Sequence, residues 1–243
     1  MAYLEERYFG YGGSAAEAST DARIGFIRRT YAHLALAVAA CVGLEAILLN
    51  TPAVTEFVMR NLFGAGRLAW LGVMALFVFG GMAARGLASS STSKGAQYAG
   101  LALEVLVWSL VLLPVLLIAE MKSPGGKLAT QAGLMTLVVF GGLTVTVFVT
   151  KSDFSFLGMG LTVAGFLAFA MVLIAVIFGL SLGIWFTFLM LALACGYILY
   201  DTSNILHHYG TEQHVLAAVV LFGSVATLFY YILSLLLQSN RSE

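Results

Sequence analysis

The chain has 243 residues, of which 60% are hydrophobic and 10% are charged, and its mean hydropathy is +0.96. A soluble domain of this composition would expose large apolar patches, so a protein with several membrane-spanning segments is the class that fits. The formal net charge is zero, with 12 basic and 12 acidic residues. This balance argues against nucleic acid as a partner, because nucleic-acid-binding proteins carry a clustered basic face.

The chain contains seven apolar segments of the length that a spanning helix requires, which is about 20 residues. They lie at about 31–49, 68–84, 96–119, 128–150, 156–178, 181–200 and 214–237. Each segment is continuously apolar rather than alternating, which is typical of helices and not of membrane strands. We therefore predict an all-α membrane protein with seven transmembrane helices between residues 26 and 238, with the lipid bilayer as its surroundings.

The two ends of the chain are polar. Residues 1–25 are rich in Gly, Ala and Ser and predict a flexible tail, and residues 239–243 predict a short C-terminal tail. Arg28 and Arg29 directly precede the first apolar segment. Because cytoplasmic segments of membrane proteins are enriched in Lys and Arg, we expect the N-terminus in the cytoplasm and the C-terminus outside.

Asp201 ends the sixth apolar segment on the expected cytoplasmic side. An ionisable group beside lipid is costly and is therefore often paired and functional. Asp201 is thus a candidate for an ion-binding or proton-titrating switch paired with Arg85, and it is the only candidate metal ligand; the alternative is an interfacial carboxylate hydrated by water. Asn204 and His208 share its helical face if the helix continues.

Glu104 is the deepest carboxylate that the pattern places in a span. It belongs either to an ion or proton path or to a protonated, hydrogen-bonded contact between helices. Glu45 lies near the outer end of the first segment, where exposure at the membrane interface is the simpler expectation. Histidines cluster at the end of the sixth segment without a metal-binding spacing. Catalytic motifs are missing as well, so we predict that the chain is not an enzyme.

Three segments together resemble the Bax inhibitor-1 family, also called the transmembrane Bax-inhibitor-motif family. They are 26–34 with Tyr31, 150–158 with Lys151 and Asp153, and 196–202, which ends with Asp201 and Thr202. The resemblance covers about residues 23–237. The chain is similar to a bacterial member of the family, and this implies a multi-pass protein of the bacterial inner membrane. It also implies that the seventh helix lies at the centre of a bundle formed by the other six.

The resemblance further implies a pH-sensitive calcium leak. In the family, two aspartates, one ending the sixth helix and one in the seventh, share a proton and pair with an arginine of the second helix. Asp201 matches the first aspartate and Arg85 best matches the arginine. The second aspartate is absent, because Gly223 or Ser224 stands in its place and Thr227 stands near the family's usual asparagine.

Two functions from different classes follow. The first is a cation leak with an Asp201–Arg85 latch, Ca²⁺ as the transported ion and no cofactor. The second is a non-conducting modulator of a membrane protease or of a stress and cell-death pathway, in which the N-terminal tail with Tyr3, Tyr8, Phe9 and Tyr11 contacts the partner. A small transporter using Glu104 as a proton site is a weaker alternative, because no inverted repeat is evident.

Overall fold

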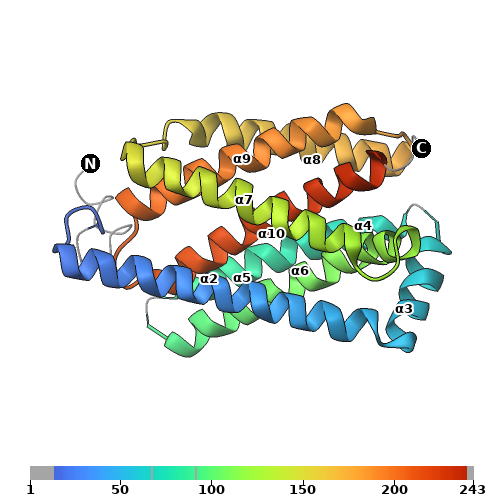
Figure 1. Cartoon of the computed structure of the whole chain (residues 1–243), viewed down its shortest axis with the longest axis horizontal. Coiled ribbons are helices and arrows are strands. Elements are labelled where there is room, and N and C mark those ends of the chain that lie inside the picture. Colours follow the sequence, from blue (N-terminus) through green and yellow to red (C-terminus); the bar gives the residue numbers. More distant parts are fainter. Residues whose placement is uncertain (1–13, 67, 91, 240–243) are drawn as a thin grey trace.

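The computed structural model describes residues 14–66, 68–90 and 92–239, which form a bundle of helices (Figure 1). The helices are α2 (Thr20–Leu49), α3 (Pro52–Val58), α4 (Ala69–Ala75), α5 (Gly81–Ala88), α6 (Lys94–Lys122), α7 (Lys127–Thr150), α8 (Leu157–Phe178), α9 (Gly183–His207) and α10 (His214–Ser239). Two π-helical turns, Met59–Phe63 and Leu76–Gly80, follow α3 and α4. Because α4 and α5 join through the second turn into one helix, seven helices are long and apolar enough to cross a membrane. The predicted all-α fold is confirmed.

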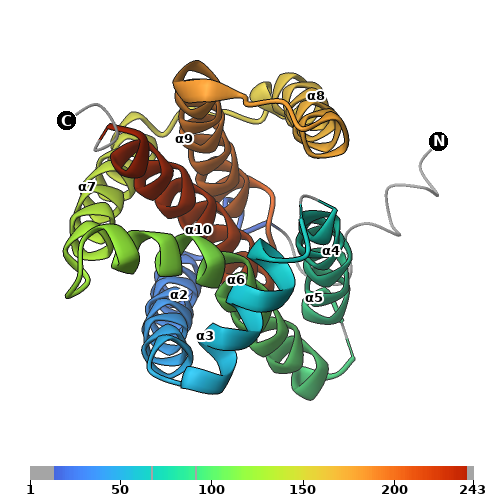
Figure 2. The ribbon, with the colours of Figure 1, turned by 90° about the vertical axis from the view of Figure 1, so that its right-hand side faces the viewer.

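The last helix, α10, lies at the centre of the bundle (Figure 2). It packs against α2, α5, α6, α7 and α9, whereas α8 packs mainly on α9 at the edge. The most apolar stretches of α6 and α10 are each 67% buried, against at most 22% in the other five spans. The predicted central seventh helix is therefore confirmed, and α6 shares the interior with it.

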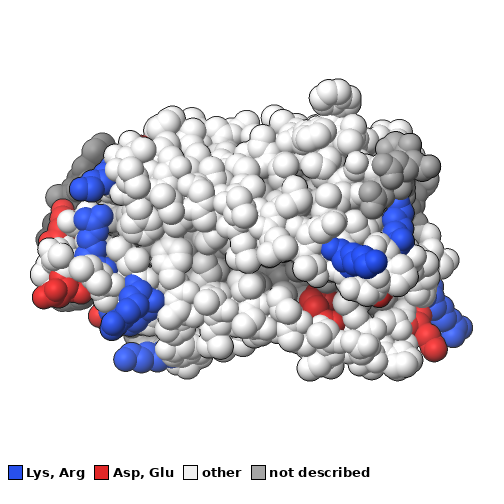
Figure 3. Space-filling view, viewed as in Figure 1, with Lys and Arg blue, Asp and Glu red and all other residues white. Residues whose placement is uncertain are grey.

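Charged side chains gather at the two ends of the molecule, and the belt between them is almost entirely uncharged (Figure 3). Large apolar side chains cover the outside of the belt, among them Phe79, Val138 and Trp185. Such a surface needs a hydrocarbon environment, so the chain is a multi-pass integral membrane protein surrounded by the lipid bilayer. We call the end at which α2 begins the proximal end and the opposite one the distal end.

The first helix begins well before the predicted position. It starts at Thr20, and the Ser19 hydroxyl caps it by accepting a hydrogen bond from the backbone N–H of Ala22 at 3.4 Å, as is usual for an N-terminal serine. Before it, the backbone N–H of Ala15 donates to the Tyr209 carbonyl at 2.8 Å. Residues 14–25 are therefore packed or helical, and the predicted flexible tail is wrong for them; residues 1–13, with the four aromatic residues singled out above, lie outside the described residues.

The sixth span also runs further than its apolar pattern, ending at His207 instead of Tyr200. Hydropathy alone placed the end at Asp201. The helix continues because Asp201, Thr202 and Ser203 are all buried against neighbouring elements.

The helices α5 and α6 approach each other very closely at Gly100 of α6. A Cβ atom at Gly100 would lie 2.5 Å from the Ala84 carbonyl oxygen and 2.6 Å from the Ala88 backbone nitrogen. Only a glycine permits this approach. Because Arg85 follows Ala84, the contact fixes the position of Arg85 against α6.

The pair α8 and α9 is joined by two tyrosines of α9. The Tyr197 hydroxyl donates to the Leu161 carbonyl of α8 at 2.9 Å. The ring of Tyr200 lies against Gly158, where a Cβ would come within 2.7 Å of it. The α8–α9 hairpin is thus held together by contacts at several levels along its length.

Candidate functional site

Asp201 lies inside the bundle near its proximal end. Asp201 is only 8% exposed. One of its carboxylate oxygens accepts a hydrogen bond from the Ser224 hydroxyl of α10 at 2.5 Å. The alternative of a water-exposed interfacial Asp201 is therefore wrong. Ser224, rather than Gly223, is the residue of α10 that faces Asp201.

Glu104 of α6 is 1% exposed, and its position is fixed by Trp108. The Trp108 indole N–H donates to Glu104 Oε1 at 3.1 Å, while Oε2 has no hydrogen-bond partner among the described residues. A buried carboxylate oxygen without a partner is energetically unfavourable. Such groups are retained chiefly where they bind a proton or an ion.

Gly223 of α10 is the point at which the second carboxylate and the arginine meet. A Cβ atom on Gly223 would lie 3.1 Å from Glu104 Oε1 and 3.5 Å from Arg85 Nη2. The absence of a side chain at Gly223 therefore leaves room for both groups. Glu104 and Asp201 approach neighbouring positions of α10, Gly223 and Ser224, although they come from α6 and α9.

Arg85 interacts electrostatically with both carboxylates, Glu104 and Asp201. It forms a direct ion pair with neither of them, because the one ion pair within the part of the chain that the structure describes joins His208 to Asp153. Two buried acidic side chains of the proximal half thus lie near one basic side chain, Arg85, which is itself exposed. The carboxylate that the sequence lacks on the seventh helix has a counterpart in Glu104 on the third span.

The other predicted neighbours of Asp201 make different contacts. The Thr227 hydroxyl donates to the Gly223 carbonyl of its own helix at 2.8 Å. Asn204 contributes its backbone carbonyl, which accepts from the His208 N–H at 2.7 Å and ends α9. His208 lies beyond the helix and does not share the face of Asp201, contrary to the expectation from spacing.

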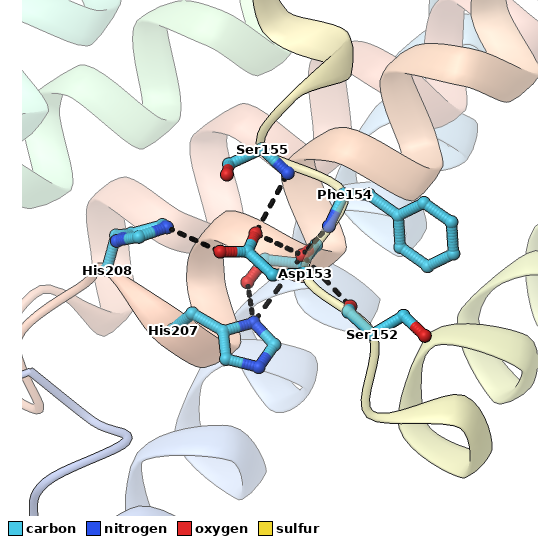
Figure 4. A network of polar contacts seen from close by, with 7 residues as sticks. Ser152, Asp153, Phe154, Ser155, His207 and His208 are labelled. Carbon is cyan, nitrogen blue, oxygen red and sulfur yellow. Dashed lines mark hydrogen bonds and ion pairs between the residues drawn. The ribbon is translucent and has the colours of Figure 1, made fainter.

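The motif residues after α7 form a separate network on the proximal surface (Figure 4). The Ser203 hydroxyl accepts from the Phe154 N–H at 2.8 Å, which joins the α7–α8 loop to α9. Asp153 accepts from the Ser155 N–H at 2.9 Å and lies 3.5 Å from His208 Nε2. The hydrogen bond from the Ser155 backbone holds the pKa of Asp153 below its ordinary value, with smaller contributions from both histidines.

Two further motif residues support this end of the bundle. Lys151 ends α7 in the left-handed region, with φ 51°, a conformation that is unfavourable for residues other than glycine. The Tyr31 ring of α2 packs on Phe148 of α7, with the ring centroids 6.1 Å apart. The contact of Ser203 with the loop was not predicted, because the apolar pattern of the sixth span ends before this residue.

Glu45 occupies an unexpected environment near the distal end. It is only 6% exposed, and both of its carboxylate oxygens lack a hydrogen-bond partner among the described residues. One turn earlier on α2, the Cys41 sulfur lies 3.4 Å from the Ser109 hydroxyl of α6. The expected interfacial exposure of Glu45 is therefore wrong.

The acidic side chains of this arrangement are few for a metal site. Within the described residues there is no group of three or more His, Cys, Asp or Glu side chains placed to hold a metal ion. Asp201 with one hydroxyl supplies far fewer oxygens than the six to eight that Ca²⁺ prefers. What the site offers is two buried carboxylates near an exposed arginine, a set of charges whose balance changes with one proton.

Comparisons with known proteins agree with this architecture. The family model described as "Inhibitor of apoptosis-promoting Bax1" matches residues 23–241. Protein lifeguard 4 of Mus musculus is 29% identical over 241 residues, which is 96% of this chain and 93% of the relative. The Golgi anti-apoptotic protein of Vaccinia virus (strain Lister) is 28% identical over 242 residues, with the same coverage.

A shorter similarity extends to bacteria. An uncharacterized protein of Pseudomonas aeruginosa is 32% identical over 117 residues, which is 46% of this chain and 50% of the relative. No solved structure matches the chain.

The family match covers nearly the whole chain and includes every span of the bundle. It also includes Asp201 and Arg85, the two residues that the sequence resemblance singled out. The chain therefore belongs to the Bax inhibitor-1 family of multi-pass membrane proteins.

Proposed function

We propose that the protein is a pH-sensitive cation leak, with Ca²⁺ as a transported ion, closed by a latch of Asp201, Glu104 and Arg85. The observation that carries the proposal is the meeting of these three side chains at Gly223 and Ser224 of the central helix. They come from α9, α6 and α5, so attraction between them holds three helices against α10.

The latch responds to protons because its net charge depends on two carboxylates. With both ionised, the exposed Arg85 is attracted to each of the two buried carboxylates, and burial of the carboxylates strengthens that attraction relative to bulk water. Protonation of either carboxyl group weakens that attraction and lets α5 separate from the centre. The leak should therefore increase as the pH falls.

The same geometry favours conduction of a cation over stable binding of that cation. A conducting site must bind an ion weakly enough to release it, and Asp201 with Ser224 is too small a set of ligands for a resident Ca²⁺. Glu45 would provide a second carboxylate for the ion toward the distal end. The Cys41 and Ser109 side chains lie between Glu45 and the latch.

Flux into liposomes tests the latch. Purified protein is reconstituted around a Ca²⁺-sensitive dye, and the leak rate is measured from about pH 8 to about pH 5 for the native chain and for Asp201→Asn. The variant should leak faster than the native chain at about pH 8 and should respond less to pH, because Glu104 is then the one carboxylate of the latch that can still gain a proton. Asp21→Asn, at an exposed position in the first turn of α2, is the matched control and should keep the native pH response.

Two results would overturn the latch. One is an identical, pH-independent leak in the native protein and in Asp201→Asn. The other is the absence of any leak above protein-free liposomes in both.

We further propose that the protein lies in a bacterial inner membrane, with its proximal end in the cytoplasm. The P. aeruginosa relative supports the bacterial membrane, and the Arg28-Arg29 pair beside the first span supports this orientation. Because the described residues contain an odd number of candidate spans, this orientation would put the C-terminus outside. Alkaline phosphatase fused after residue 243 should be active in a bacterial host, and activity only of a fusion to the N-terminus would reverse the assignment.

The second candidate function is a non-conducting modulator of a membrane protease or a stress pathway. The relative named as a Golgi anti-apoptotic protein favours it. In this case residues 1–13 make the contact, because residues 14–25 are occupied in the fold. Deleting residues 2–13 should abolish co-purification of a partner without lowering the thermal stability of the bundle; retained co-purification contradicts this function.

A further inference from the structure

The proximal surface contains a pocket of about 380 Å³ that lies outside the latch. Its walls come from the first turns of α2, the last turn of α7 and the last turn of α9. These three helix ends lie at the same end of the bundle (Figure 1). In a membrane protein, this is the level at which lipid headgroups meet the protein.

The lining of the pocket combines basic and apolar groups. Arg23, Lys151 and His207 supply its basic side chains, while the aliphatic and aromatic part includes Ile27 and Phe148. No acidic side chain belongs to the lining, although Glu17 and Asp21 are close to lining residues in the sequence and are exposed. A ligand with a negative head and an apolar body would match this distribution.

His207 is held in place for such a role. Its Nδ1 atom lies 2.9 Å from the Ser203 carbonyl oxygen, while Nε2 has no partner among the described residues. The first turn of α2 lies in the same wall, and the backbone N–H groups of a helix start favour negative charge.

Lys151 lines the pocket from a strained backbone position. It occupies a left-handed C-terminal position with φ 51°, whereas the equivalent position after α8 is occupied by Gly179 with φ 72°. A glycine would avoid the backbone strain at Lys151. The strained lysine places an ammonium group at the pocket that a glycine could not supply.

We propose that this pocket binds the phosphate headgroup of an anionic membrane lipid. Arg23 and Lys151 contact the phosphate, and the apolar wall receives the first carbons of the acyl chains. The site is independent of the latch, since none of the latch residues lines it.

The test uses the full-length protein in a neutral detergent, with native mass spectrometry to count bound lipids. Phosphatidylglycerol is compared with phosphatidylcholine, which carries the same phosphate together with a positive choline. We expect the protein to retain phosphatidylglycerol preferentially. Lys151→Gly and Arg23→Gln should each weaken that retention about fivefold, the effect of removing one basic residue near an anionic surface.

Lys151→Gly also separates binding from folding. If Lys151 were only a helix end, this variant would be more stable than the native protein and would bind lipid equally well. We expect higher thermal stability together with weaker lipid retention. Lys127→Gln, at the exposed start of α7 at the other end, is the control and should retain lipid as the native protein does.

Three outcomes would overturn the proposal: equal retention of the two lipids, retention unaffected by both pocket variants, and loss of bound phosphatidylglycerol when inorganic phosphate is added at the same concentration. The last outcome would assign the pocket to a free anion instead of a lipid.

Discussion

The close contact between α5 and α6 can be tested by Gly100→Ala. The new methyl carbon would lie 2.5, 2.6 and 3.0 Å from three backbone atoms of Ala84 and Ala88, where ordinary contacts begin at 3.4 Å. The helices must therefore separate by about 1 Å, since backbone atoms cannot rotate away. The displacement falls beside Arg85 and should reach the latch.

Overpacking of this kind costs about 1–3 kcal/mol, and a clash with backbone on α5 belongs at the upper end of that range. Alanine in place of glycine in a helix returns about 0.5–1 kcal/mol. The free energy of unfolding should thus fall by about 2 kcal/mol. Gly43→Ala is the matched control, because a Cβ there meets nothing within 4 Å, and it should gain about 0.5–1 kcal/mol.

Both variants can be compared by denaturant unfolding in detergent and by flux in liposomes. Gly100→Ala should lower the unfolding free energy and weaken the pH dependence of the leak, as Asp201→Asn does. A Gly100→Ala protein as stable as Gly43→Ala, with a native pH response, would refute the argument that this contact positions Arg85.

Three further outcomes are expected. Ser224→Ala leaves Asp201 buried without its hydrogen bond and should lower the unfolding free energy by about 1–3 kcal/mol. The control Thr227→Ala should change the unfolding free energy less, and equal effects of the two variants would contradict this prediction. Glu45→Gln removes an unpartnered buried carboxylate and should raise the unfolding midpoint at about pH 8; a lower midpoint would show that the carboxylate is stabilising. The pKa of Asp153 is lowered on folding, so its contribution to stability is present above the ordinary pKa of 3.8 and is lost as the pH falls through the lower folded value. Asp153→Asn should therefore be less stable than the native protein at about pH 7 and equal to it at about pH 2, and a difference that persists in acid would contradict this.

Hydrophobic runs were sufficient to predict the number and order of the spans, because each helix must satisfy its backbone inside the apolar core of the membrane. Hydropathy placed the end of the sixth span at Asp201, since it cannot register that a polar residue is buried against a neighbouring helix. The same limitation hid the environment of Glu45. The pairing of Ser224 with Asp201 was one of two possibilities in the sequence.

The role of Gly223 was harder to predict. Its lack of a side chain makes room for Glu104 and Arg85, which lie more than 100 residues earlier in the chain. Their meeting depends on how three helices pack, and one sequence does not contain that information. The resemblance to a family with two aspartates directed attention to the seventh helix, whereas the second carboxylate comes from the third span.

The packing of α8 on α9 has a mechanical consequence. Tyr197 and Tyr200 interlock the two helices, and Ser203 ties the loop between α7 and α8 to the same helix. Asp201 lies on α9 between these attachments. A shift of α9 that separates Asp201 from α10 must therefore move α8 and the loop between α7 and α8 together with α9, as one rigid body. A change in the protonation of the buried carboxylate would in this way displace groups at the membrane surface.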